Sequence, residues 1–91
     1  MPTPPRYRLA ISPSASRSLR NLPSALLPAI ARRIDLLAGN PRPLRTKKLS
    51  GKKGTYRVRA GDYRILYSVD DRDRVVTVLD VALRAEVYKK R

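Results

Sequence analysis

The chain has 91 residues, the size of one small domain spanning residues 1–91 without a second domain. It contains no Cys and no His, which excludes a disulfide framework, the usual zinc sites and Ser-His-Asp or Cys-His catalysis, and we expect no cofactor. Lys and Arg number 21 against 7 Asp and Glu, and this net charge of +14 favours a polyanionic partner. A hydrophobic content of 42% excludes a disordered basic tail. Without a segment apolar enough for a signal peptide or a membrane span, we expect a cytoplasmic protein with no membrane partner.

The first elements are predicted to be a strand and a short helix. Residues 6–11 alternate polar and apolar side chains, which is typical of a strand with one buried face. The apolar side chains predicted on that face are Tyr7, Leu9 and Ile11. Ser12 is a suitable N-cap and Pro13 a suitable first helical residue, so an amphipathic helix is predicted from there to about Asn21.

A second helix is predicted after Pro23 and ends at Gly39-Asn40-Pro41, because this sequence is a strong stop signal. Its apolar stripe comprises Leu26 or Leu27, Ile30, Ile34 and Leu37. Pro28 would remove a backbone hydrogen bond inside a helix, so the helix either kinks there or begins near it. We expect the two helices to form an antiparallel pair.

Positive charge is concentrated in the first two thirds of the chain. Residues 1–59 hold 14 basic side chains and one acid, Asp35, whereas residues 60–91 hold 7 basic and 6 acidic side chains. Residues 40–59 contain eight cations and no acid, a pattern that predicts contact with phosphates and competes with the alternative of a solvated loop. The cations predicted to bind RNA or the ribosome are Arg42, Arg45, Lys47, Lys48, Lys52 and Lys53.

The last third of the chain has the period-two pattern of strands. Strands are predicted over residues 56–59, 62–69 and 74–81, with a polar turn over residues 70–73, and they are expected to form an antiparallel meander. Tyrosines in these strands are expected to pack in the core, Tyr67 above all. With the first strand, the order β-α-α-β-β-β predicts an α+β domain with both helices packed on one face of a small sheet.

Three segments resemble a known family. They are Lys-Leu-Ser-Gly at 48–51, Tyr-Arg-Val-Arg-Ala-Gly-Asp-Tyr-Arg-Ile-Leu-Tyr at 56–67, and Val-Leu-Asp-Val-Ala-Leu-Arg-Ala-Glu-Val-Tyr at 78–88. Together they resemble the RelE-type toxins of the RelE/ParE superfamily. The resemblance implies a RelE-like fold and a toxin of a toxin–antitoxin pair. It also implies a ribosome-dependent endoribonuclease that cuts translated mRNA in the A site, and an acidic RelB-like antitoxin that silences it in a hetero-oligomer.

The same resemblance implies the site residues. Arg64 and Arg84 match phosphate-stabilising arginines, Tyr88 matches the catalytic tyrosine, and Arg57 and Arg59 lie where many members carry paired lysines. Because Arg57 and Arg59 are two residues apart in a strand, they should share one face of the sheet. Arginine does not deprotonate, so acid–base work would rest on Tyr88, whose ring could alternatively stack on a base of the message.

Other functions stay open at this point. Ala82-Leu83 precedes Arg84 where many relatives carry a polar residue, which allows an attenuated relative that binds but cuts slowly. A ParE-like member of the superfamily would instead inhibit DNA gyrase. A ribosome- or nucleic-acid-binding module without catalysis would need only the basic segment, and its affinity would fall steeply with salt.

Overall fold

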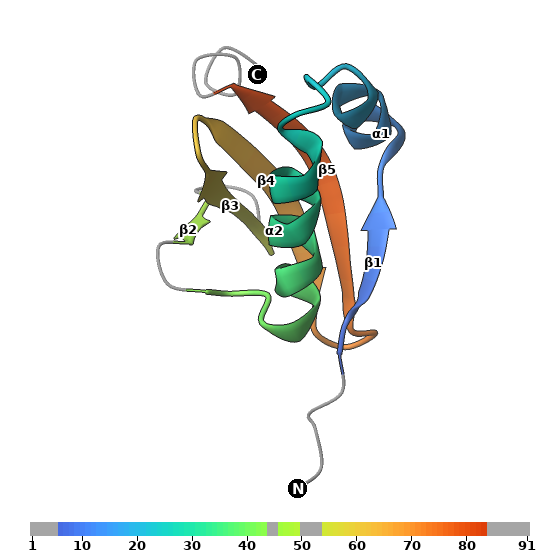
Figure 1. Cartoon of the computed structure of the whole chain (residues 1–91). Coiled ribbons are helices and arrows are strands. Elements are labelled where there is room, and N and C mark those ends of the chain that lie inside the picture. Colours follow the sequence, from blue (N-terminus) through green and yellow to red (C-terminus); the bar gives the residue numbers. More distant parts are fainter. Residues whose placement is uncertain (1–5, 44–45, 50–53, 84–91) are drawn as a thin grey trace, which may run out of the picture.

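The computed structural model describes residues 6–43, 46–49 and 54–83, and Figure 1 shows their arrangement. The elements in chain order are β1 (Arg8–Ile11), α1 (Pro13–Arg20), α2 (Leu27–Gly39), β2 (Lys47–Lys48), β3 (Thr55–Ala60), β4 (Tyr63–Asp70) and β5 (Val75–Leu83). The predicted α+β class with two helices packed on a small sheet is therefore confirmed.

The sheet has five strands in the order β1-β5-β4-β3-β2. Strands β2 to β5 pair antiparallel, which confirms the predicted meander, and β1 joins the other edge parallel to β5, so the complete sheet is mixed. The sequence does not predict strand β2, because Lys47 and Lys48 lie in a basic segment without alternating polar and apolar side chains. It is only two residues long. It forms because β3 lies beside it and pairs with it through Tyr56 and Arg57, and it has no apolar pattern of its own.

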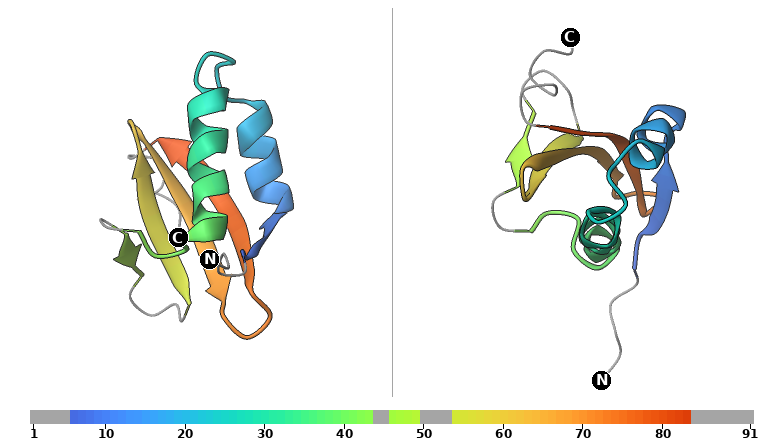
Figure 2. Two further views of the ribbon diagram at one scale, coloured as in Figure 1. Left: turned by 60° about the horizontal axis from the view of Figure 1, so that its bottom comes forward. Right: turned by 45° about the horizontal axis from the view of Figure 1, so that its top comes forward.

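Both helices begin where local capping chemistry allows. The Ser12 side chain accepts a 3.0 Å hydrogen bond from the backbone N–H of Ala15, as an N-cap should. Helix α2 begins at Leu27 and has Pro28 in its first turn, where the missing N–H removes no helical hydrogen bond. The sequence allowed either a kink at Pro28 or a helix that begins near it, and the structure shows the second. Figure 2 shows α1 and α2 running antiparallel, as predicted.

One face of the sheet is buried by the helices. The core comprises Ala15, Ile30, Ile34, Leu37, Val58, Ile65, Tyr67, Val76, Val78 and Val81. Tyr67 is completely buried, as expected. The apolar stripe of α2 begins at Ile30, since Leu26 and Leu27 are both 39% exposed, contrary to the prediction that one of them belongs to the buried face.

The predicted buried face of β1 is wrong for two of its three residues. Leu9 is 37% and Ile11 42% exposed, and only Tyr7 packs against the core. The physical reason is position: β1 is the edge strand, and α1 packs mainly against β5 rather than over β1. No helix in the described residues is long and apolar enough to cross a membrane.

Candidate active site

A basic concavity lies beside strand β3 and includes Lys47 of the short strand β2. Its volume is about 620 Å³. It is lined by Arg33, Lys47, Arg57, Val58, Arg59, Gly61, Asp62 and Arg64. Five of these side chains are cations and one is an acid, so the concavity has the electrostatic character of an anion site.

Strand pairing places like charges side by side in this concavity. Lys47 of β2 is the direct register partner of Arg57 in β3, and Arg59 of β3 is the direct partner of Arg64 in β4. Like charges directly opposite each other destabilise a sheet. Two such pairs on adjoining strands therefore concentrate positive charge at the concavity at some cost to the stability of the sheet.

Arg64 has an unsatisfied nitrogen within this cluster. Its side chain is half-buried, and its Nη1 atom is buried with no hydrogen-bond partner among the residues that the structure describes. Buried guanidinium N–H groups almost always have an acceptor, so this donor is suited to a bound anion.

The turn between β3 and β4 holds the Arg59 side chain. Its Nε donates a 3.2 Å hydrogen bond to the carbonyl of Gly61. Gly61 has φ +63°, a conformation that costs little only in glycine. The turn thus holds the Arg59 side chain at the end of β3.

Two predicted RNA-binding cations lie apart from this concavity. Arg42 and Lys48 line another hollow, beside the β4–β5 turn. Arg42 forms an ion pair with Asp71, donates to Tyr56 Oη at 3.2 Å, and lies over the Tyr56 ring with Cζ 5.4 Å from its centroid. The basic segment therefore has an acidic neighbour in space, Asp71, which lies in the turn between β4 and β5.

This small network is reflected in the protonation of its members. Asp71 accepts a 2.6 Å hydrogen bond from Tyr7 Oη, which together with the Arg42 ion pair lowers the pKa of its carboxyl. The same contact with Asp71 raises the pKa of Tyr7. The Tyr56 hydroxyl, and then Asp71, raise the pKa of Arg42, so its charge is fixed at every accessible pH.

The remaining predicted site residues lie outside the described residues; they are Arg45, Lys52, Lys53, Arg84 and Tyr88. Within the described part, β5 ends at Leu83, which is the register partner of Tyr63. Tyr63 follows directly after the turn residues Gly61 and Asp62 that line the concavity. The motif containing Arg84 and Tyr88 therefore begins, in sequence, one residue beyond this end of the sheet.

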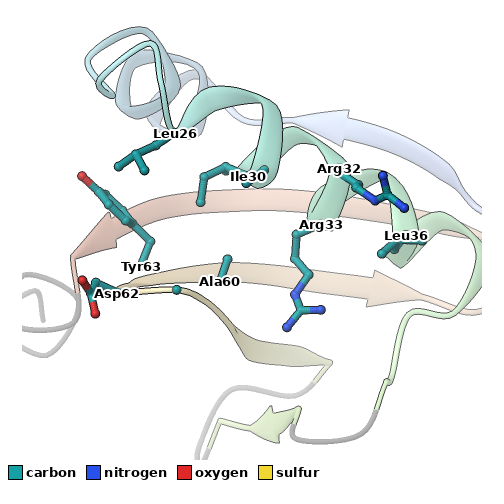
Figure 3. Close-up of a pocket in the computed structure, with 10 residues that line it drawn as sticks. Leu26, Ile30, Arg32, Arg33, Leu36, Ala60, Asp62 and Tyr63 are labelled. Atoms are coloured by element: carbon teal, nitrogen blue, oxygen red, sulfur yellow. The ribbon is translucent and has the colours of Figure 1, made fainter.

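Sequence reasoning missed Arg33, which reaches the concavity from α2. Charged residues on an exposed helix face carry no signal of their own, and only the pairing of α2 with the β3 edge distinguishes Arg33 from Arg32. Figure 3 shows the two side chains pointing apart, with Arg33 directed toward β3. A second, mostly apolar groove of about 470 Å³ lies beside it, between α2 and the β3–β4 hairpin, with Leu26, Ile30 and Tyr63 in its walls.

The chain is similar to known proteins in sequence and in fold. Residues 9–88 match the family described as the ParE toxin of type II toxin–antitoxin systems, parDE. The chain is 33% identical to Toxin RelG of Mycobacterium tuberculosis over 88 residues, covering 92% of this chain and 98% of the relative. It belongs to the RelE/ParE toxin superfamily.

Two further similarities are to RelE toxins. Toxin RelE of Mycobacterium tuberculosis is 31% identical over 84 residues, covering 91% of this chain and 87% of the relative. The archaeal RelE–RelB complex from Pyrococcus horikoshii contains a chain of the same fold, with a TM-score of 0.76 and 33% identity over 87% of this chain and 96% of that one. The protein is a RelE-type toxin of a type II toxin–antitoxin system.

Proposed function

We propose that this toxin is a ribosome-dependent mRNA endoribonuclease that cuts translated messages in the ribosomal A site. The proposal rests on two pairs of like-charged register partners, Lys47–Arg57 and Arg59–Arg64, which line one concavity. A phosphodiester brought there would find several cationic donors around one phosphate. Such a preorganised cluster stabilises charge as it develops in a transition state.

The proposed reaction uses the 2′-hydroxyl of the message as its nucleophile. The 2′-oxygen attacks the adjacent phosphorus, the bond from phosphorus to the 5′-oxygen breaks, and a 2′,3′-cyclic phosphate and a free 5′-hydroxyl result. The reaction needs a group that takes the 2′-proton, cations for the dianionic phosphorane, and a proton for the leaving oxygen. Arg57, Arg59 and Arg64 are proposed to supply the cations.

Arg84 and Tyr88 complete the proposal through the family resemblance. Arg84 is proposed as a further phosphate contact and Tyr88 as the general base. Arginines cannot remove a proton near neutral pH, so a set made only of Arg57, Arg59 and Arg64 would bind phosphate without cutting it efficiently. A tyrosine beside such cations would have a phenolate stabilised by their charge.

The partners follow from charge and from the relatives. The RelE of Pyrococcus horikoshii was solved as a complex with RelB, and we propose an acidic RelB-like antitoxin for this chain, in a toxin–antitoxin hetero-oligomer. A net charge of +14 suits an acidic segment that folds onto the toxin. Six cations are proposed to contact 16S rRNA and mRNA in the cytoplasm, where ribosomes translate: Arg42, Arg45, Lys47, Lys48, Lys52 and Lys53.

Primer extension on a reporter mRNA in a reconstituted translation reaction tests the activity. Wild type, Arg84→Ala and Tyr88→Phe are each incubated with and without ribosomes. Cleavage within translated codons, dependent on ribosomes and lost in both variants, is the expected result. Full cleavage by Tyr88→Phe would remove the proposed base, and RNA binding without cleavage by folded wild type would identify an attenuated relative or a binding module.

The family match supports a second candidate. Residues 9–88 match a model of ParE toxins, and a ParE-like member would inhibit DNA gyrase. Supercoiling of relaxed plasmid by gyrase, measured with and without the toxin, separates the two. Inhibition of supercoiling together with intact mRNA in the translation reaction would favour the gyrase function over the endoribonuclease.

A further inference from the structure

Arg33 bonds to the main chain of the candidate site rather than to an acid. From α2, its Nε and Nη2 atoms donate hydrogen bonds of 3.1 and 2.9 Å to the carbonyl oxygen of Arg59. Figure 3 shows the side chain extending from α2 toward β3, while Arg32 points elsewhere. A planar guanidinium that donates twice to one oxygen fixes that oxygen in direction as well as in distance.

The Arg59 carbonyl lies outside the part of β3 that pairs with β2. Strand β2 pairs with Tyr56 and Arg57 only. The Thr55 carbonyl points to that side, since it accepts a 2.9 Å hydrogen bond from Leu49 N–H. By the alternation of a strand, the Arg59 carbonyl points to the same side, two residues beyond Arg57, the partner of the first β2 residue, Lys47. Arg33 thus supplies the donors to a β3 carbonyl that lies beyond the residues paired with β2.

The clamped peptide lies at the centre of the cationic cluster. Arg59 is the register partner of Arg64, and its own side chain is held by the Gly61 carbonyl at 3.2 Å. Arg59 is therefore held at two points. Arg33 binds its main-chain carbonyl, and the Gly61 carbonyl in the β3–β4 turn binds its side chain. Without the clamp, mutual repulsion between the Arg59 and Arg64 guanidinium groups would push the end of β3 outward.

We infer that Arg33 is a positioning residue of the active site: it clamps the end of β3 so that Arg57 and Arg59 face the same phosphate as Arg64. This inference rests on the proposed endoribonuclease function. In the clamped state, Arg33 also lines the concavity together with its other cations. Arg33 acts on the reaction through the Arg59 main chain.

The chain offers a matched control in Arg32. Arg32 is the next residue on α2, carries the same charge, is exposed, and makes no hydrogen bond among the described residues. Arg32→Ala removes as much charge as Arg33→Ala but leaves the clamp intact. Arg33→Lys keeps the charge and loses the fork, because an ammonium group cannot reproduce two parallel N–H donors.

Steady-state cleavage of translated mRNA by wild type, Arg33→Ala, Arg33→Lys and Arg32→Ala separates positioning from charge. We expect kcat to fall about tenfold or more in both Arg33 variants, with KM nearly unchanged, because small misplacements of catalytic groups have effects of this size. Arg32→Ala should cleave like wild type. Full activity of Arg33→Lys, or equal losses in Arg33→Ala and Arg32→Ala, would overturn the inference.

Amide hydrogen exchange of the isolated toxins tests the clamp without any cleavage. Exchange in residues 59–63 should accelerate in both Arg33 variants and stay at the wild-type rate in Arg32→Ala, while the core strand β5 keeps its protection in all of them. Unchanged exchange in Arg33→Ala would overturn the clamp. If wild type does not cleave mRNA, the endoribonuclease proposal fails, and the exchange measurement still decides whether Arg33 holds β3.

Discussion

Ser18 of α1 donates a 2.8 Å hydrogen bond from its Oγ to Oδ1 of Asp80 in β5, 62 residues later. Asp80 is only 7% exposed, and the same oxygen also accepts from the backbone N–H of Val81 at 2.9 Å. A buried carboxylate is stable only when its acceptors are satisfied. This contact therefore fastens α1 to the central part of the sheet.

Ser18→Ala should lower the free energy of unfolding by about 1–3 kcal/mol, because it removes a donor from a buried carboxylate. Urea denaturation followed by circular dichroism measures the change. Ser16→Ala is the matched control on the same helix, since Ser16 only accepts a 3.2 Å hydrogen bond from Arg20 at the surface. Equal stability of the two variants would show that the Ser18 contact contributes little.

Tyr67 makes a second long-range tie, from the core to the segment after α2. Its hydroxyl donates a 2.6 Å hydrogen bond to the carbonyl of Pro41, and its ring stacks on Tyr56 with centroids 5.9 Å apart. Tyr67→Phe keeps the ring but leaves the Pro41 carbonyl without its donor, so stability should fall by about 1–3 kcal/mol. Thermal and urea unfolding give the value, and Tyr63→Phe, at a half-buried position outside this contact, serves as the control.

The strands β3, β4 and β5 were predictable because their apolar side chains recur with period two and are separated by Gly61 and by the polar residues 70–73. Helix α2 was predictable from its stop signal at Gly39. The exposure of Leu9 was not predictable, since an alternating strand has the same pattern at a sheet edge as at its centre. Which face a helix covers is decided by tertiary packing.

The candidate site was predictable only in part. Alternation predicted that Arg57 and Arg59 share a face, but the placement of Arg64 beside Arg59 depends on the strand register, which the turn at Gly61 sets. The Arg42–Asp71 ion pair joins residues 29 apart and has no local signal. Arg33 depends on where α2 crosses the β3 edge.

The Asp71 carboxyl gives the fold an acid-sensitive contact. Hydrogen bonding from Tyr7 and pairing with Arg42 lower its pKa below the ordinary value of 3.8. A carboxyl whose pKa is lowered in the folded state adds stability above its unfolded pKa, and this stability is lost as pH falls through the folded pKa. Asp71→Asn should therefore reduce the pH dependence of stability below about pH 4.

Urea midpoints between neutral pH and acid measure this dependence. Asp73→Asn is the control, because Asp73 lies in the same turn and no contact of its side chain with Tyr7 or Arg42 is present. If Asp71→Asn and wild type lose stability in parallel on acidification, the Asp71 network does not contribute to the acid response.

Arg64 is the cation whose geometry should matter most for phosphate binding. Its Nη1 is buried and has no partner among the residues that the structure describes, so a ligand oxygen has a ready donor there, and lysine cannot present the same planar pair of N–H groups. Arg64→Lys should lower the rate of mRNA cleavage by roughly 10²–10³-fold, the size of effect seen when one preorganised transition-state donor is removed.

In the folded toxin, Arg64→Ala should also reduce the slope of RNA affinity against salt by about one unit. Fluorescence anisotropy of a labelled single-stranded RNA over a salt series measures that slope, and Arg17→Ala on the surface of α1 controls for the loss of one charge. A normal cleavage rate in Arg64→Lys would mean that Arg64 contributes charge without directional contact, and the phosphate would then have to be held by the other cations of the concavity.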